Sequence, residues 1–130
     1  MTVDFEPVDG ITVCHCDMCR RWTGAFIEIP AKIGSVSHDG PVRAYASSAQ
    51  VERAWCDRCG STLWYLYKEG ETRDYSFNAG LVDGAGGLIL TREDFIDRKP
   101  AGYAFAGDHP RATEAQNDHA LAGSVEGACS

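Results

Sequence analysis

Cys14-His15-Cys16-Asp17-Met18-Cys19 is the stretch of this 130-residue chain that decides its fold. In an extended segment, residues two apart point to the same side. Cys14 and Cys16 can therefore face one metal ion together, while His15 faces away and finds a hydrogen-bonding partner on the far side. Cys19 returns to the same ion through a turn, as in other C-x-x-C steps. Clustered thiolates at this spacing are typical ligands of zinc, so we predict a Zn²⁺ site on Cys14, Cys16 and Cys19.

The number of ligands bears on what this site does. Three thiolates can meet on one zinc, and no neighbouring residue supplies a fourth ligand. A closed structural site takes four protein ligands, whereas a catalytic site keeps one position open. Zinc with three thiolates carries a net charge near −1 and suits the capture of another thiol as its thiolate. This interpretation predicts an enzyme whose substrate is a small thiol.

A second pair of cysteines, Cys56 and Cys59, leaves another interpretation open. Together with Cys16 and Cys19 it makes two C-x-x-C steps, the ligand set of a closed zinc ribbon. The zinc would then be purely structural and the protein a non-catalytic interaction module, with Cys14 spare. The loop between the pairs is longer than the roughly 15 to 20 residues of ordinary ribbons, which favours the three-cysteine site without excluding the ribbon.

Composition narrows the function classes further. Twelve Lys and Arg stand against 19 Asp and Glu, a formal net charge of −7, which repels a phosphate backbone and predicts no binding to nucleic acid. No apolar run approaches the ~20 residues of a membrane span, and the ends carry no secretion or lipidation motif. We expect a cytoplasmic protein with reduced cysteines and no membrane partner. Cys129 is expected to be a free thiol.

Short alternating segments separated by turn residues predict a mainly β fold. The expected strands are Thr2–Phe5, Ile11–Cys14, Ala25–Ile29, Val42–Tyr45, Val51–Trp55 and Leu63–Tyr67, with weaker candidates at Asp74–Phe77 and Tyr103–Phe105. Helical signal is confined to a short helix after the first cysteine cluster and to Arg92–Phe95. We expect one domain over residues 1–110 and a polar, flexible tail over residues 111–130.

At this point the sequence resembles a known family, the glutathione-dependent formaldehyde-activating enzymes, also called S-(hydroxymethyl)glutathione synthases. The match begins with Cys14-His15-Cys16-Asp17-Met18-Cys19-Arg20-Arg21-Trp22-Thr23-Gly24-Ala25-Phe26, which is similar to the family's C-H-C-x-x-C-R/Q-x-x-[ST]-G-A. It continues in Trp55-Cys56-Asp57-Arg58-Cys59-Gly60-Ser61 and, more weakly, in Ile96-Asp97-Arg98-Lys99-Pro100. The resemblance covers most of the chain up to about residue 111.

The resemblance implies a small antiparallel β-tent zinc-binding fold and carbon–sulfur lyase activity. In the family's reaction glutathione and formaldehyde combine to S-hydroxymethylglutathione, a step in formaldehyde detoxification. The resemblance places the catalytic zinc on Cys14, Cys16 and Cys19, and a second, structural zinc on Cys56 and Cys59 with an earlier C-x-C pair. Arg20 and Arg21 follow the cluster directly, where guanidinium groups can hold the two carboxylates of glutathione or simply stay solvated.

One part of the family's pattern has no counterpart here. The family's early C-x-C lies within a Gly-Cys-x-Cys-Gly stretch, but this sequence begins Met1-Thr2-Val3-Asp4-Phe5. Either the start of the sequence lies too late or this member has lost the structural zinc. The metal role of Cys56 and Cys59 therefore stays open, as does the question of a homo-oligomer.

Overall fold

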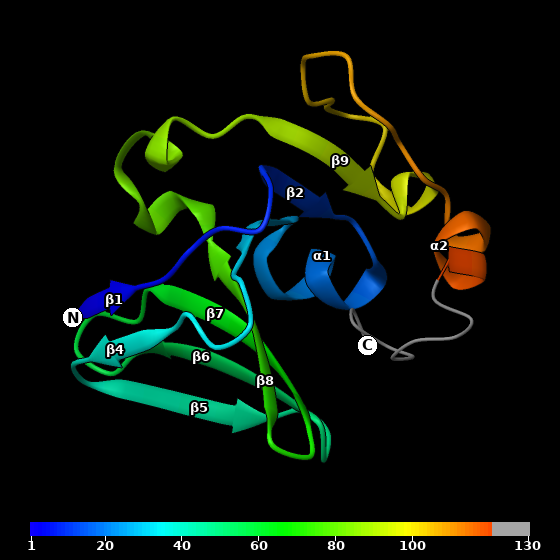
Figure 1. The fold of residues 1–130 in the computed structure, drawn as a ribbon. Coiled ribbons are helices and arrows are strands. Elements are labelled where there is room, and N and C mark those ends of the chain that lie inside the picture. The colour runs from blue at the N-terminus through cyan, green and yellow to red at the C-terminus, as the bar shows by residue number, and fades with distance from the viewer. Residues whose placement is uncertain (121–130) are drawn as a thin grey trace.

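The computed structural model describes residues 1–120 and shows a mainly β protein, as the sequence predicts (Figure 1). A seven-stranded sheet runs in the order β5-β6-β7-β8-β3-β2-β9, and a separate two-stranded sheet pairs β1 with β4. The strands are β1 (Thr2–Asp4), β2 (Ile11–Cys14), β3 (Phe26–Pro30), β4 (Ser37–Asp39), β5 (Val42–Ala46), β6 (Val51–Cys56), β7 (Thr62–Glu69), β8 (Thr72–Asn78) and β9 (Leu90–Asp94). The helices are α1 (Asp17–Thr23) and α2 (Glu114–Ala120), with short 3-10 turns at Ala79–Leu81, Asp83–Gly87 and Ile96–Arg98.

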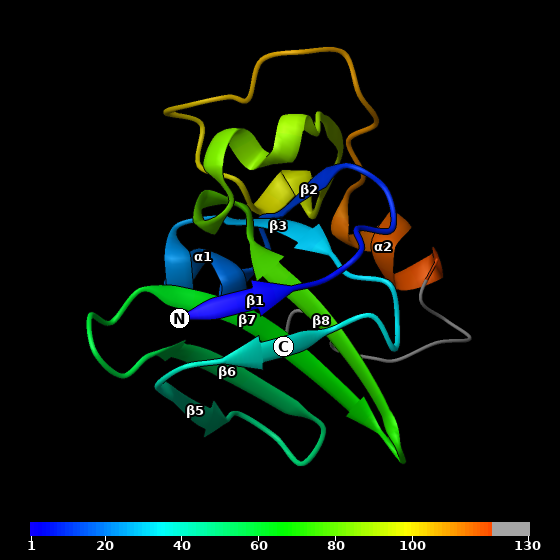
Figure 2. The same cartoon turned by 60° about the vertical axis from the view of Figure 1, so that its left-hand side comes forward.

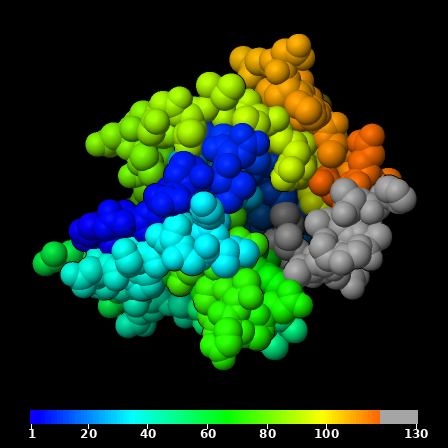
Figure 3. Space-filling view, in the orientation of Figure 1, coloured from blue at the N-terminus to red at the C-terminus, as the bar shows by residue number. Residues whose placement is uncertain are grey.

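The sheet bends into two wings. Strands β5 to β8 form the lower wing in Figure 1 and β3, β2 and β9 the upper one, with α1 between them; the turned view of Figure 2 shows the same division. In the space-filling view the N-terminal strand lies between the two wings on one face (Figure 3). This arrangement puts the end of β2 and the start of α1, and with them the cysteine cluster, inside the bend.

Strand β7 contributes side chains to the hydrophobic clusters on both faces of the sheet. Its side chains alternate, so Trp64 and Leu66 pack into a core with Phe77, while Tyr65 packs against the cysteine cluster on the opposite face. β7 joins β8 through the two-residue loop at Gly70 and Glu71, where Gly70 takes a positive φ of 56°. Such tight hairpin loops need left-handed backbone, which glycine adopts without strain.

The cysteine cluster itself starts helix α1. Cys16 is the N-cap residue, and its sulfur accepts a hydrogen bond from the backbone N–H of Cys19 at 3.4 Å. Gly24 ends the helix at a φ of 86°, donating its N–H to the carbonyl of Arg20. The predicted short helix is confirmed, but it begins inside the cluster rather than after it.

Three local expectations differ from the structure. Arg92–Phe95 is not helical, because Arg92 to Asp94 lie in β9, which pairs in parallel with β2; the sheet is therefore not wholly antiparallel. Tyr103–Phe105 forms no strand. Strand β4 was not predicted, and it is held by its register with β1 rather than by a local pattern.

The C-terminal part of the described chain packs onto β9. The backbone N–H of Glu93 donates to the carbonyl of Pro110 at 3.0 Å, and the carbonyl of Glu93 accepts from the N–H of Ala112 at 2.9 Å. The Asn117 side chain of α2 accepts a hydrogen bond from the backbone N–H of Phe95 at 2.8 Å. The domain boundary expected at residue 110 stays a prediction, and residues 121–130, with Cys129, lie outside the described part. None of the helices within residues 1–120 has the length and apolarity needed to cross a bilayer.

Gly10 allows β2 and β9 to approach each other. It is buried at the start of β2, and a Cβ built there would collide with the carbonyl oxygen of Ile89 and lie 2.6 Å from the Thr91 methyl group. We expect Gly10→Ala to destabilise the fold by about 2 kcal/mol, because the parallel pair must open to make room. Urea unfolding followed by circular dichroism measures this. Gly102→Ala is the matched control, since its Cβ meets nothing within 4 Å, and equal midpoints for the two variants would contradict the prediction.

Candidate metal centre

The structure brings the three predicted zinc ligands together. Cys14 ends β2, Cys16 caps α1, and Cys19 lies in the first turn of that helix. Their sulfurs lie within 4.8 Å of one another, and the residues are only 3%, 6% and 3% exposed. Two sulfurs on one tetrahedral zinc lie about 3.8 Å apart, given Zn–S bonds of ~2.3 Å, so small rotations of the side chains suffice. Cys14 takes part in a disulfide in this structure, and binding through all three sulfurs requires its reduction.

The pKa values of Cys16 and Cys19 favour the binding of a cation by the cluster. A hydrogen bond from the Cys19 thiol lowers the pKa of Cys16 to about 7 against the opposing effect of burial. The same hydrogen bond, with burial, raises the pKa of Cys19. Cys16 and Cys19 therefore share one proton between two buried sulfurs, and a soft divalent cation that displaces it provides the missing positive charge.

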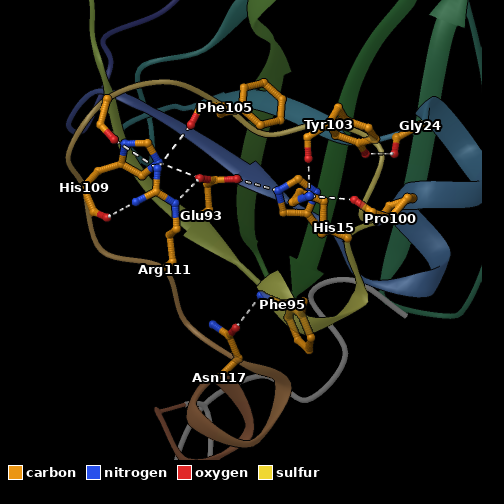
Figure 4. A network of polar contacts seen from close by, with 12 residues as sticks. His15, Gly24, Glu93, Phe95, Pro100, Tyr103, Phe105, His109, Arg111 and Asn117 are labelled. Atoms are coloured by element: carbon orange, nitrogen blue, oxygen red, sulfur yellow. Dashed lines mark hydrogen bonds and ion pairs between the residues drawn. The ribbon is translucent and has the colours of Figure 1, made fainter.

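On the other side of β2, His15 belongs to a buried network centred on Glu93 (Figure 4). The carboxylate of Glu93 is fully buried and binds His15 Nε2 at 2.7 Å, His109 Nε2 at 2.6 Å and Arg111 Nε at 3.0 Å. The backbone N–H of His15 also donates to the carbonyl of Asp94 at 3.0 Å. The predicted role of His15 as a hydrogen-bonding residue is confirmed, since its ring binds Glu93 and is not part of the cysteine group.

Glu93 and His109 were missed by sequence reasoning. His109 is only 9% exposed and hydrogen-bonds the same carboxylate as His15. Burial raises the pKa of Glu93, but the hydrogen bonds of His109 and His15 outweigh it and hold the pKa below its ordinary value. The carboxylate is thus charged at neutral pH, and its stabilising effect is lost only in acid.

Replacing Glu93 tests how much the fold depends on this network. All three partners direct N–H groups or ring nitrogens at its two oxygens, so the amide of Glu93→Gln must turn its NH₂ group toward at least one of them. We expect a loss of about 3 kcal/mol, because buried partners are left without their anion. Thermal unfolding measures it, with a Tm lowered by roughly 10 °C. Glu114→Gln, which removes the exposed partner of Arg98, is the control and stays within about 1 kcal/mol; similar shifts for both variants would refute a special role for Glu93.

A second carboxyl group, Glu28, lies on the cysteine face of the sheet. It pairs in register with Thr12, which points to the same side as Cys14, and it accepts a hydrogen bond from the Thr12 hydroxyl at 3.2 Å. The negative charge of Glu28 also contributes to the raised pKa of Cys19. Burial raises the pKa of Glu28 to about 8 in spite of the Thr12 hydrogen bond. This group therefore exchanges a proton near neutral pH.

The raised pKa of Glu28 predicts a pH-dependent stability. The folded chain holds a proton that the unfolded chain releases at its ordinary pKa of about 4.5, so the free energy of unfolding falls as pH rises from there to about 8. We expect Glu28→Gln to remove this decline. Urea midpoints of reduced, chelator-treated protein at pH 5, 6.5, 8 and 9 measure it, with Glu71→Gln as a control for loss of one exposed charge. A constant difference between wild type and Glu28→Gln across this range would contradict the assignment.

Cys56 and Cys59 lie apart from the first cluster. Cys56 is buried in the core around Trp64, whereas Cys59 is exposed and its sulfur is 3.1 Å from the Ser61 hydroxyl. That contact, with help from Cys56, lowers the pKa of Cys59. Both cysteines line a cavity of about 450 Å³ beside the N-terminal strand. Among the side chains that the structure describes, those of residues 1–117, no third metal-binding group joins them, so the structure does not assemble the closed zinc ribbon from these four cysteines.

The two arginines after the cluster have ordinary surroundings. Arg20 pairs with Asp17 one turn earlier, at 3.5 Å, and Arg21 is exposed. Their role as carboxylate anchors stays a prediction. Arg53, which no sequence pattern singled out, lies on the cysteine face opposite Tyr65, with its guanidinium over the ring of Trp22 at 5.2 Å.

Comparison with known proteins defines the class. Residues 1–98 match the family of glutathione-dependent formaldehyde-activating enzymes, and the chain belongs to this family. It is also similar to an uncharacterized lyase of Schizosaccharomyces pombe, with 37% identity over 98 residues, which cover 74% of this chain and 71% of that protein. The resemblance inferred from the cysteine motifs is thereby confirmed.

Proposed function

We propose that this protein is a zinc-dependent carbon–sulfur lyase that joins a thiol, glutathione or a close analogue, to formaldehyde. The observation that carries the proposal is the convergence of three buried sulfurs, one of which gives up its proton readily. Family membership supports it, as does the similarity to a protein named as a lyase. The donor set of Cys14, Cys16 and Cys19 suits zinc and leaves a fourth position for substrate.

The reaction forms one bond between the thiol sulfur and the formaldehyde carbon. The S–H proton must leave, and the aldehyde oxygen must gain a proton to become the hydroxyl of the S-hydroxymethyl product. Bound zinc would supply a Lewis acid that favours the thiolate and polarises the carbonyl group. Glu28, on the same face with a pKa of about 8, is suited to take the proton from the thiol and return it to the oxygen.

The rest of the chain holds the ligands in place. His15 is fixed by Glu93 and by the backbone of Asp94, so the two cysteines beside it are directed toward the opposite side of β2. Helix α1 positions Cys19 relative to Cys16 through its first turn. These contacts hold the sulfurs before a metal or substrate arrives, which lowers the entropy cost of binding either one.

Serine variants separate this proposal from a structural zinc. Reduced wild-type protein is expected to bind zinc and to accelerate the exchange of ¹³C-formaldehyde into S-hydroxymethylglutathione, followed by NMR. Cys16→Ser is expected to lose zinc, measured by atomic absorption, together with the accelerated exchange, because two thiolates bind the ion far more weakly. Cys59→Ser is expected to keep both.

Two outcomes would contradict the proposal. If Cys59→Ser releases the same zinc ion as Cys16→Ser, the metal is held by the four-cysteine ribbon. If zinc-loaded wild type leaves the exchange at its spontaneous rate for glutathione and for other thiols, the protein is not a lyase of this type.

A further inference from the structure

Arg53 is a partly buried cation on the cysteine face of the sheet. It lies on β6, directly opposite Tyr65 of β7 and two residues from Val51, and both neighbours pack against the cysteine cluster. Its guanidinium lies over the indole of Trp22 from α1, 5.2 Å from the ring centroid. The side chain of Arg53 thus lies among residues of strands β6 and β7 and helix α1.

No residue in the described part of the chain gives Arg53 the hydrogen-bonding partner that a partly buried guanidinium needs. Its Nε is buried and makes no hydrogen bond, and the side chain forms no ion pair with any residue in the described range. Other arginines, such as Arg43 with Asp57 and Arg98 with Glu114, are paired with carboxylates. A desolvated donor without an acceptor is costly, and cation–π contact with Trp22 offsets only part of that cost.

The charge of Arg53 acts on the groups of the cluster. The pKa of Cys19 is raised chiefly by its hydrogen bond with Cys16 and by burial, and the positive charge of Arg53 opposes this increase. Burial likewise raises the pKa of Tyr65, again against the effect of Arg53. Because Val51 and Tyr65 beside Arg53 both pack against the cysteine cluster, an anion bound by Arg53 would lie near the three sulfurs that the proposed function assigns to zinc.

We propose that Arg53, supported by Trp22, binds a carboxylate of the thiol substrate and selects for carboxylate-bearing thiols. The inference rests on the proposed function, since it places the sulfur of that substrate at the cysteine cluster. A guanidinium presents paired N–H groups that match the two oxygens of a carboxylate, and a substrate carboxylate would supply the acceptor that Arg53 lacks. Arg20 and Arg21, by contrast, are partly or fully solvated and gain less from such a contact.

The experiment compares Arg53→Gln and Arg53→Lys with wild type on glutathione and on its dimethyl ester, which keeps the thiol but lacks the carboxylates. For Arg53→Gln we expect the KM for glutathione to rise roughly tenfold to a hundredfold, as the loss of a charged hydrogen bond implies, with kcat nearly unchanged. The KM for the dimethyl ester stays the same. The KM of Arg53→Lys for glutathione is expected to be intermediate, because an ammonium group keeps the charge but lacks the paired N–H groups of a guanidinium.

Binding is also measured without turnover, by calorimetric titration of glutathione and of the dimethyl ester into each zinc-loaded protein. The dissociation constant of glutathione is expected to rise in Arg53→Gln as its KM does, while zinc content stays at the wild-type level. Arg43→Gln, on the neighbouring strand β5, is the matched control and leaves both constants unchanged. If circular dichroism shows that Arg53→Gln does not fold, Arg53→Lys is used in its place. The test is then the ratio of its dissociation constants for glutathione and for the dimethyl ester.

Two results would overturn the inference. An equal loss of affinity for glutathione and its ester, or a loss of zinc, would mean that Arg53 only balances the charge of the thiolates. Unchanged affinity for glutathione in both variants would mean that it touches no substrate carboxylate. Failure of the lyase proposal is distinct, because then no thiol is turned over by wild type, whereas the calorimetric comparison of glutathione with its ester still tests Arg53.

Discussion

The position of the cysteine cluster depends on the contacts that the buried carboxylate of Glu93 makes. A charge in the interior is tolerated only with partners, and Glu93 takes them from β2, through His15, and from the segment of His109 and Arg111. These partners fasten β9 alongside β2 in parallel, a pairing that no hairpin could provide. Side chains alternate in direction along this extended segment. Fixing His15 on one side therefore places Cys14 and Cys16 on the other.

The two sides of β2 therefore carry different chemistry. On one side the Glu93 carboxylate is satisfied by nitrogen donors and stays ionised, so it serves the structure alone. On the other, Cys16 and Cys19 share a proton, and Glu28 holds one weakly near neutral pH. Groups with shifted pKa values on one face of the strand, and a paired carboxylate on the other, are the pattern expected of a reactive site beside the contacts that support it.

The local parts of this arrangement could be predicted from the sequence, and the long-range parts could not. The C-x-C step, the turn to Cys19 and the alternating strands depend on neighbours in the chain, so residue spacing was enough. Arg92 to Asp94 carry residues with reasonable helix propensity, and only pairing with β2, about 80 residues away, makes them a strand. Glu93, His109 and Arg53 carry no local signal, because each acquires its role from partners on other elements.

Electrostatics explains why an unpaired arginine belongs on this face. The chain has a net charge of −7, and three thiolates on a divalent cation add a local charge near −1. At an effective dielectric constant of 20, a carboxylate about 8 Å from that charge is repelled by roughly 2 kcal/mol. A substrate with a carboxylate needs a nearby cation to cancel this repulsion, and arginines already paired with Asp or Glu contribute little. Arg53 is partly buried and stacked on Trp22, and no described residue supplies such a partner, so its charge can act on the substrate.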